Sequence, residues 1–263
     1  MKISIVTLSF NQATYLRAAI DSVLQQGYPD LDYIVVDPGS KDSSREIVHS
    51  YGDRIAHLIF EPDHGASDGL NKGFARATGE IFGFLNADDL LEPGALQRVA
   101  DFFSRNPQCD IAFGNGHVID GEGNRLKHYR ARDFTARRYF YGGSQWLQQS
   151  TFFRAASFRQ SGGFNIENRT CWDGELFVTM VSRGARAGYI DADLAGFRIH
   201  PSSISGSGSL NTQYRADARR IFRQVRGRSW SVADEVWRYL YRAEGLGFRI
   251  ASHLQHFAGR GAA

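Results

Sequence analysis

Residues 3–37, ISIVTLSFNQATYLRAAIDSVLQQGYPDLDYIVVD, carry the clearest indication of the fold class. Residues 3–10 are apolar and β-branched, which predicts a strand, and residues 31–37 predict a second strand. Between them, residues 11–26 carry apolar side chains at helical spacing: Leu16, Ala19, Ile20, Val23 and Leu24. A strand, a helix and a second strand in this order are typical of a parallel sheet covered by helices.

Strand-like and helix-like segments continue to alternate up to residue 105, which predicts an α/β fold with a mostly parallel sheet and helices on both faces. Such sheets bind ligands at the carboxyl ends of their strands. Asp37, Asp63 and the adjacent pair Asp88 and Asp89 follow three different predicted strands. The spacing therefore predicts an acidic cleft along one edge of the sheet.

The alternation weakens after residue 105. Residues 109–120 and 124–131 predict a hairpin around the glycine-rich turn at 121–123, and residues 148–200 return to mixed strands and helices. Residues 187–191 and 194–200 predict two short strands in this part.

Composition narrows the class of protein. The chain has 263 residues, 42% of them hydrophobic and 22% charged, and no run of about 18 apolar residues that would predict a membrane span. Its N-terminus alternates like a strand rather than a signal peptide. Two distant cysteines predict neither a disulfide framework nor a cysteine zinc cluster, and favour a cytoplasmic setting. A net charge of +3 does not indicate nucleic-acid binding.

Six segments resemble family-2 glycosyltransferases of the GT-A fold and occur in the same order as in that family: IVTLSFNQ, VVDPGSKDSS, FEPDHGASDGLNKGFARATGEIFGFLNADD, QQSTFFR, CWDGELFVTMVSRG and LAGFRIHPSS. The resemblance implies a GT-A catalytic domain over residues 1–205. Its nucleotide-binding half would span 1–105 and its acceptor-binding half 106–205, followed by a basic, aromatic, mainly helical extension over 206–263.

Adjacent carboxylates repel one another unless a cation or hydrogen-bond donors offset the repulsion, and hard oxygen ligands suit Mg²⁺ or Mn²⁺. The resemblance implies that Asp88 lies at the donor ribose and Asp89 at a metal ion on the diphosphate. A capping role for Asp89, at a helix entered through Pro93, is the alternative. His200 would be a further metal ligand or a structural residue, and Arg198 a phosphate contact.

The resemblance places Asp37 at the nucleobase, where a carboxylate can accept from a ring N–H such as that of uracil. Pro38 departs from the common form of this motif, and an Asx-turn is the alternative role for Asp37. Ser9 and Asn11, after the first strand, would belong to the same pocket.

Residues 68–72 lie near the start of a predicted helix, and the resemblance implies that this start faces the nucleotide. Asp68 and Asn71 would then hydrogen-bond the donor, and Lys72 would offset phosphate charge. Because Asp68 and Lys72 are four residues apart on one helix face, an ion pair between them is the alternative.

Asp173 matches the family's catalytic base, which takes the proton from the acceptor hydroxyl during an inverting transfer. Glu175 is the rival residue, and an N-cap at the start of a helix is the structural alternative for Asp173.

The prediction is a metal-dependent, inverting glycosyltransferase that uses Mn²⁺ or Mg²⁺ and moves a sugar from a nucleotide-diphosphate donor, with a UDP-sugar favoured. The acceptor would be a hydroxyl of a glycan or a lipid-linked intermediate in cell-surface polysaccharide synthesis. An inactive GT-A-like binding protein is the alternative. A sugar-nucleotide nucleotidyltransferase fits less well, because the first loop, TLSFNQA, has no glycine.

The extension over residues 206–263 has two interpretations. Its arginines and aromatic residues suit an anionic membrane surface. Acidic residues interrupt this positive charge, which suits packing on the core or a homo-oligomer interface instead. The first would make the protein cytoplasmic and peripheral at the membrane.

Overall fold

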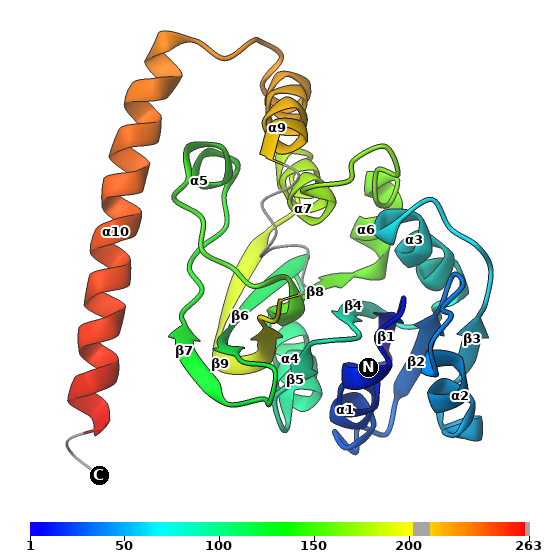
Figure 1. Ribbon diagram of the computed structural model, residues 1–263. Helices are drawn as coiled ribbons and strands as arrows, with labels where there is room; N and C mark the ends of the chain where they lie inside the picture. The colour runs from blue at the N-terminus through cyan, green and yellow to red at the C-terminus, as the bar shows by residue number, and fades with distance from the viewer. Residues whose placement is uncertain (202–210, 261–263) are drawn as a thin grey trace.

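The computed structural model describes residues 1–201 and 211–260. Its strands form one mixed sheet in the order β3-β2-β1-β4-β8-β6-β9-β5, with β7 paired to β6 (Figure 1). The strands are β1 (Ile3–Leu8), β2 (Leu31–Val36), β3 (His57–Ile59), β4 (Ile81–Asn86), β5 (Leu90–Leu91), β6 (Ile111–Ile119), β7 (Arg125–Tyr129), β8 (Thr151–Arg154) and β9 (Ala187–Arg198). The helices are α1 (Ala13–Leu24), α2 (Ser44–His49), α3 (Ala66–Arg76), α4 (Ala95–Arg105), α5 (Ala136–Tyr141), α6 (Ala155–Ser161), α7 (Trp172–Ser182), α9 (Asn211–Arg226) and α10 (Val232–Arg260).

The first half of the sheet is parallel, as the alternation predicts. β1 lies between β2 and β4, and β2 pairs in parallel with β3. Leu8 at the end of β1 is level with Val36 on one side and Asn86 on the other. The three strands therefore end at the same edge, and the loops that follow them leave the sheet together.

The second half adds antiparallel pairings. β8 runs antiparallel between β4 and β6, and β6 and β7 form the predicted hairpin. Where the sequence predicts two short strands after residue 186, the structure has the single long strand β9, parallel to β6. Its pairing shifts register on either side of Asn115, and such irregularities let a long strand bend without ending.

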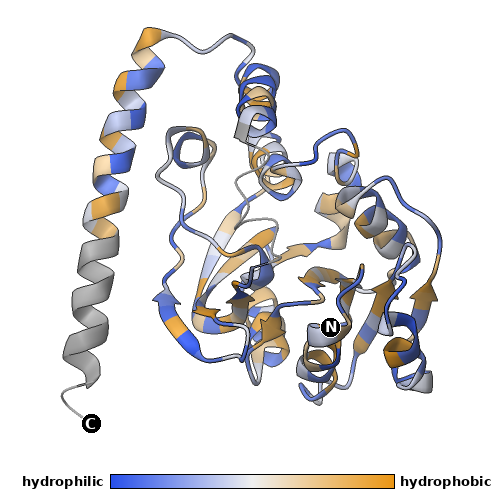
Figure 2. Cartoon of the chain, in the orientation of Figure 1, coloured by the Kyte–Doolittle hydropathy of each residue, from blue (hydrophilic) through white to orange (hydrophobic). Residues whose placement is uncertain are grey.

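Two apolar layers hold the sheet between helices. One layer joins it to α1, α2 and α4 through side chains such as Ile20 and Phe103, and the other joins it to α3, α6 and α7 through side chains such as Phe74 and Phe177. Figure 2 shows the apolar colour along the strands between these helices. The core thus fills both faces and leaves the edge loops for polar residues.

The C-terminal extension packs on α5 and α7. Ile221 and Phe222 of α9 are buried, and α10 lies beside α5 (Figure 1). There the buried Asp234 accepts a hydrogen bond of 2.7 Å from the Tyr141 hydroxyl. These contacts agree with the interpretation that the extension packs on the core. However, α10 also exposes several large apolar side chains: Val232, Val236, Trp237, Tyr239, Leu240 and Leu246. Within the described ranges, none of the helices combines the length and apolar character needed to cross a bilayer.

Candidate active site

The loops after β1, β2 and β4 lie side by side at the carboxyl edge of the sheet. The Ser9 N–H donates to the Val36 carbonyl over 2.9 Å, and the Ala87 N–H donates to the Leu8 carbonyl over 2.9 Å. Ser9 is therefore placed between the loop of Asp37 and the loop of Asp88. The structure gathers these three predicted residues at one edge, as the strand order requires.

Asp37 is fully buried, and its two carboxylate oxygens have different surroundings. Oδ1 accepts from the Ser40 N–H at 2.8 Å, the Gly39 N–H at 3.1 Å and Arg45 Nε at 3.1 Å. Oδ2 has no hydrogen-bond partner among the described residues, and neither does the buried Ser9 Oγ. Unpaired buried polar atoms cost free energy, so this pocket fits a ligand that supplies hydrogen bonds. The turn role and a ligand role can coexist, one on each oxygen of Asp37.

Asn11 links the first two loops. It has a left-handed backbone with φ 53°, its N–H donates to Ser40 Oγ at 2.8 Å, and its Oδ1 accepts from the Lys41 N–H at 2.8 Å. Asn11 therefore positions the wall of the pocket, and a direct contact with the donor stays a prediction.

Asp88 faces His200. Its Oδ2 lies 3.0 Å from His200 Nε2, and the imidazole ring packs against Tyr15 with 4.7 Å between ring centroids. The His200 side chain is 1% exposed, whereas that of Asp88 is 17% exposed. A carboxylate oxygen and an imidazole nitrogen thus meet at the edge of the sheet, with the carboxylate partly open to solvent.

Asp89, by contrast, points into the protein and is 1% exposed. Its Oδ1 accepts from the Arg198 N–H at 2.8 Å, and its Oδ2 accepts from Gln149 Nε2 at 2.6 Å and Asn86 Nδ2 at 3.1 Å. Burial, and then the charge of Asp88, raise the pKa of Asp89 above its ordinary value, although these donors act in the opposite direction. The sequence assigned the metal to Asp89, yet the carboxylate that meets His200 is that of Asp88.

Arg198 holds the loop of the two aspartates. Its Nε donates to the Asp88 carbonyl at 2.7 Å, and its Nη1 donates to the Asp120 and Gly121 carbonyls at 2.8 and 2.9 Å. The guanidinium carbon lies 4.9 Å from the centroid of the Tyr15 ring. Arg198 therefore connects the acidic loop to the β6–β7 turn, and the phosphate contact inferred from the sequence stays a prediction.

Sequence reasoning missed two residues of this centre. Gln149 lies within QQSTFFR, one of the segments that carry the resemblance, but nothing in its spacing points to Asp89. Tyr15 lies in α1, and no motif distinguishes it from other helical residues. The proposed capping role of Asp89 is wrong, because α4 begins at Ala95 with Gly94 as its N-cap.

At the start of α3, Asp68 and Lys72 form the ion pair that the sequence offered as the alternative to donor binding. Lys72 Nζ lies 3.3 Å from Asp68 Oδ2 and also donates to the Pro62 carbonyl, while the same Asp68 oxygen accepts from the His64 N–H at 2.9 Å. These bonds order the loop before α3. Contacts from Asp68 and Lys72 to a donor stay predictions, since both side chains are already engaged.

Asn71 and Asp63 also have partners within the protein. The Asn71 amide donates to the Phe164 carbonyl at 2.8 Å and accepts from the Phe164 N–H at 2.9 Å, so it holds the segment between α6 and α7. Asp63 Oδ1 accepts from the Gly65 N–H at 2.9 Å, and burial raises the pKa of this carboxyl. A contact from Asn71 to the donor remains untested.

Asp173 is the second residue of α7 and is partly buried. The helix takes Cys171 as its N-cap, so the capping alternative for Asp173 is wrong. Its Oδ1 accepts from the Gly174 N–H at 2.7 Å, and burial raises its pKa to about 6. The neighbouring Trp172 ring lies 5.5 Å from that of Phe84 on β4, which places the start of α7 against the strand that leads to Asp88.

Glu175, the rival base, is occupied. Its carboxylate pairs with Arg220 Nη1 at 2.6 Å and accepts from Asn168 Nδ2 at 2.7 Å and Asn165 Nδ2 at 3.1 Å. Burial alone would raise the pKa of Glu175, but the donors, led by Arg220, outweigh it and lower the pKa. Glu175 therefore joins α7 to α9 as a structural ion pair.

Glu175→Gln should reduce stability while preserving sugar transfer. The change removes the charge that Arg220 needs, and we expect a loss of about 1–3 kcal/mol, towards the lower end because Arg220 is 39% exposed. Urea unfolding and a transfer assay below the unfolding transition measure the two effects. Loss of transfer at unchanged stability would instead identify Glu175 as the base.

The sheet order, the two helical layers and the acidic edge define a GT-A-type α/β protein. Residues 4–160 match the profile described as Glycosyl transferase family 2, and the chain belongs to that family.

Solved structures share the fold. The chain is similar to S. aureus TarS 1-349 in complex with UDP-GlcNAc, with a TM-score of 0.72 at 17% identity over 94% of this chain and 72% of the other. It is also similar to the mannosyltransferase PcManGT from Pyrobaculum calidifontis in complex with GDP-Man and Mn²⁺, with a TM-score of 0.65 at 17% identity over 99% of this chain and 79% of the other.

Among curated proteins, the chain is 38% identical over 129 residues to an uncharacterized glycosyltransferase of Nostoc sp., covering 46% of this chain and 40% of the relative. It is 29% identical over 187 residues to a PGL/p-HBAD biosynthesis glycosyltransferase of Mycobacterium bovis, covering 69% of this chain and 70% of the relative. Because the chain spans well under two thirds of the Nostoc relative, it corresponds to only part of that protein.

Proposed function

We propose that the protein is a metal-dependent, inverting glycosyltransferase that moves a sugar from a nucleotide-diphosphate donor to a hydroxyl group. One observation carries this proposal. The unpaired buried oxygens of Ser9 and Asp37 lie at the same sheet edge as the Asp88–His200 pair, which suits a ligand that offers hydrogen-bond donors at one end and a diphosphate, bound through a cation, at the other.

The nucleobase would occupy the pocket of Asp37. A ring N–H of uracil can donate to Asp37 Oδ2, which otherwise stays buried without a partner. Structural neighbours are described with UDP-GlcNAc and with GDP-Man, so the fold serves more than one base. We favour a UDP-sugar, because uracil offers a single ring N–H for the one unpaired carboxylate oxygen; thymine offers the same group, which is why dTDP is compared below.

Asp88 and His200 would hold the metal ion. A carboxylate oxygen and an imidazole nitrogen suit Mn²⁺, and Mg²⁺ also accepts the carboxylate together with substrate phosphates. The ion would supply positive charge next to the leaving diphosphate. Asp89 and Arg198 would position the loop on which Asp88 is carried.

Asp173 would be the catalytic base. A pKa of about 6 keeps its carboxylate ionised at neutral pH while leaving it basic enough to take the acceptor's proton. The acceptor oxygen forms a bond to the anomeric carbon as the bond from that carbon to the diphosphate oxygen breaks. Attack on the face opposite the leaving group inverts the configuration, and no covalent enzyme intermediate forms.

The proposal is tested by calorimetric titration of the protein with UDP, GDP and dTDP, each with and without Mn²⁺. We expect UDP to bind most tightly and its affinity to increase with Mn²⁺. Asp37→Ala should weaken UDP binding by roughly 10–100-fold, since a hydrogen bond to a charged group contributes about 1.5–3 kcal/mol. Binding of none of the nucleotides would favour the inactive-relative alternative.

For the acceptor, we propose a hydroxyl of a glycan or of a lipid-linked intermediate in cell-surface polysaccharide synthesis. The exposed apolar side chains of α10, among them Val236 and Leu240, would suit a peripheral contact with an anionic membrane. Flotation of the protein with vesicles containing anionic lipid tests this contact, and failure to float at low salt would leave α10 as a packing element.

A further inference from the structure

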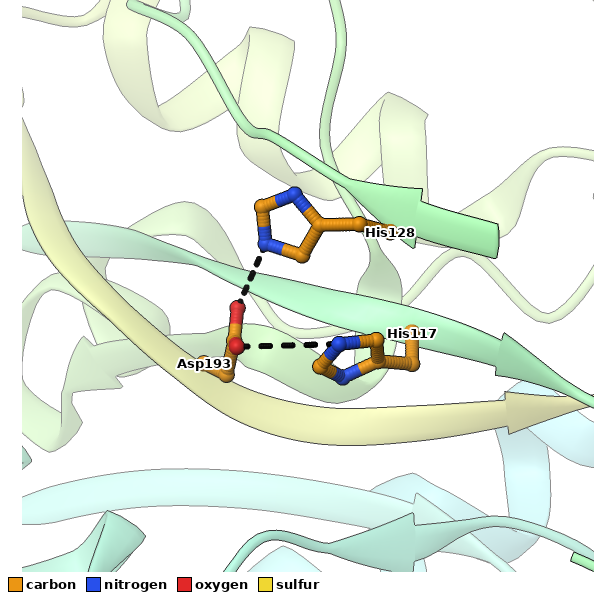
Figure 3. A group of neighbouring side chains, drawn as sticks. All are labelled: His117, His128 and Asp193. Atoms are coloured by element: carbon orange, nitrogen blue, oxygen red, sulfur yellow. Dashed lines mark hydrogen bonds and ion pairs between the residues drawn. The ribbon is translucent and has the colours of Figure 1, made fainter. Parts of the chain in front are cut away.

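A cluster of two histidines and an aspartate lies outside the candidate active site. His117 on β6, His128 on β7 and Asp193 on β9 point toward one another (Figure 3). The β6–β7 register places His117 opposite His128, with 5.1 Å between their ring centroids. Asp193 Oδ1 lies 2.8 Å from His128 Nε2, and its Oδ2 lies 3.7 Å from His117 Nε2. One possible ligand atom from each residue lies within 4.8 Å of the others.

We propose that His117, His128 and Asp193 form a second metal site, selective for Zn²⁺ or a similar divalent transition ion. In a tetrahedral zinc site with bonds near 2.1 Å, the ligand atoms are roughly 3.4 Å apart. The separations of 2.8 Å to Asp193 Oδ1 and 3.7 Å to Asp193 Oδ2 bracket this value, and the three ligand atoms lie within 4.8 Å of one another, so small side-chain movements would bring them around one ion. Two imidazole nitrogens and one carboxylate favour zinc, cobalt, nickel or copper over magnesium and calcium.

The bend in β9 brings the aspartate to the histidines. Pairing with β6 shifts register on both sides of Asn115, which lies opposite Asp193. A side chain at Gly116 would place its Cβ 2.3 Å from the Ala195 carbonyl oxygen, so glycine is needed for the close approach of the two strands. The backbone is therefore built to hold Asp193 within reach of both imidazoles.

Glu92 orients the first histidine. Its Oε1 lies 3.3 Å from His117 Nδ1, and its Oε2 pairs with Arg125 at 2.7 Å. A carboxylate at Nδ1 favours the proton on that nitrogen and leaves the Nε2 lone pair for an ion, the usual arrangement behind histidine ligands.

Access and location also suit an exchangeable ion. The His117 side chain is 8% exposed, whereas that of Asp193 is 37% exposed, so the site opens on one side. The same hairpin ends in the turn whose Asp120 carbonyl accepts from Arg198. An ion that joins β7 to β9 would therefore steady the hairpin whose turn accepts hydrogen bonds from Arg198, the residue that holds the loop of Asp88 and Asp89.

The test uses the full chain, stripped of metal by a chelator, in an Asp88→Asn background that removes the proposed donor-site ligand. Equilibrium dialysis with Zn²⁺ should show one bound equivalent that excess Mg²⁺ does not displace. His128→Gln and Asp193→Asn should each abolish that equivalent. Glu92→Gln should weaken it by roughly 10–100-fold, as expected for a residue that orients a ligand.

His49→Gln, at an exposed histidine of α2, is the matched control and should retain the ion. Titration with Co²⁺ should give a visible spectrum of a nitrogen- and oxygen-ligated ion, and Asp193→Asn should lose it. Unfolding curves measured without metal identify any variant that fails to fold. Because Asp193 is partly exposed, Asp193→Asn should disturb the fold less than His128→Gln. No bound equivalent, or one that survives both substitutions, would overturn the proposal and leave Asp193 as a hydrogen-bond partner of His128 beside His117.

Discussion

Asp173→Asn is expected to lower the rate of sugar transfer by roughly 10²–10⁴-fold while leaving nucleotide affinity unchanged. The amide has nearly the same shape and can still accept from the Gly174 N–H, so α7 should begin as in the parent protein. What it lacks is the ability to take a proton. Steady-state kinetics and calorimetry with the donor nucleotide separate the two effects.

The pH profile provides a second check on Asp173. A base acts only when deprotonated, and burial raises the pKa of Asp173 to about 6. We therefore expect kcat/KM to be constant at neutral pH and to fall as the pH drops through about 6, with a limiting slope of one proton. Full transfer in Asp173→Asn would show that Asp173 is not the base. Loss of transfer in Glu175→Gln at unchanged stability would then assign the base to Glu175.

Asp88→Asn is expected to remove the increase in nucleotide affinity that Mn²⁺ provides and to lower transfer by roughly 10²–10³-fold. A metal ion supplies several kcal/mol of transition-state stabilisation, and each 1.36 kcal/mol corresponds to a factor of ten. The Asp88 side chain is 17% exposed, and an amide of nearly the same shape fits its place beside His200, so we expect the fold to tolerate the change. Titration of the nucleotide with and without Mn²⁺, together with a thermal unfolding curve, measures both properties.

The adjacent residue supplies the matched control. Asp89→Asn should destabilise the fold by about 1–3 kcal/mol, because either orientation of the amide turns its NH₂ group toward an N–H donor, that of Arg198 or those of Asn86 and Gln149. If instead Asp89→Asn abolished the Mn²⁺ effect at unchanged stability and Asp88→Asn did not, Asp89 would be the ligand, as the resemblance implied.

Local sequence patterns were sufficient to predict the parallel half of the sheet. Periodicity over residues 3–37 predicts a strand, a helix and a parallel strand, and parallel strands share one carboxyl edge. That is why Asp37 and Asp88 could be placed together before any contact was known. The β6–β7 hairpin followed in the same way, from two strand-like segments around a glycine-rich turn.

The roles of neighbouring acids depended on residues far away in the chain. Asp89 is buried because Gln149 and Arg198, 60 and 109 positions along the chain, donate to it, and Glu175 is occupied because Arg220 reaches it from α9. The apolar spacing within a single segment cannot predict hydrogen-bond partners that lie this far away in the sequence.

Local apolar spacing and ordered motifs were enough to predict the family, the parallel half of the sheet and the edge that carries the acids. The contact between Asp88 and His200, and the meeting of two histidines with Asp193 across β6, β7 and β9, became known from the folded structure alone. Both depend on strand pairing and on bends in paired strands. Pairing and bending of strands depend on how segments that are distant in the sequence pack together, and not only on the residues next to each site in the chain.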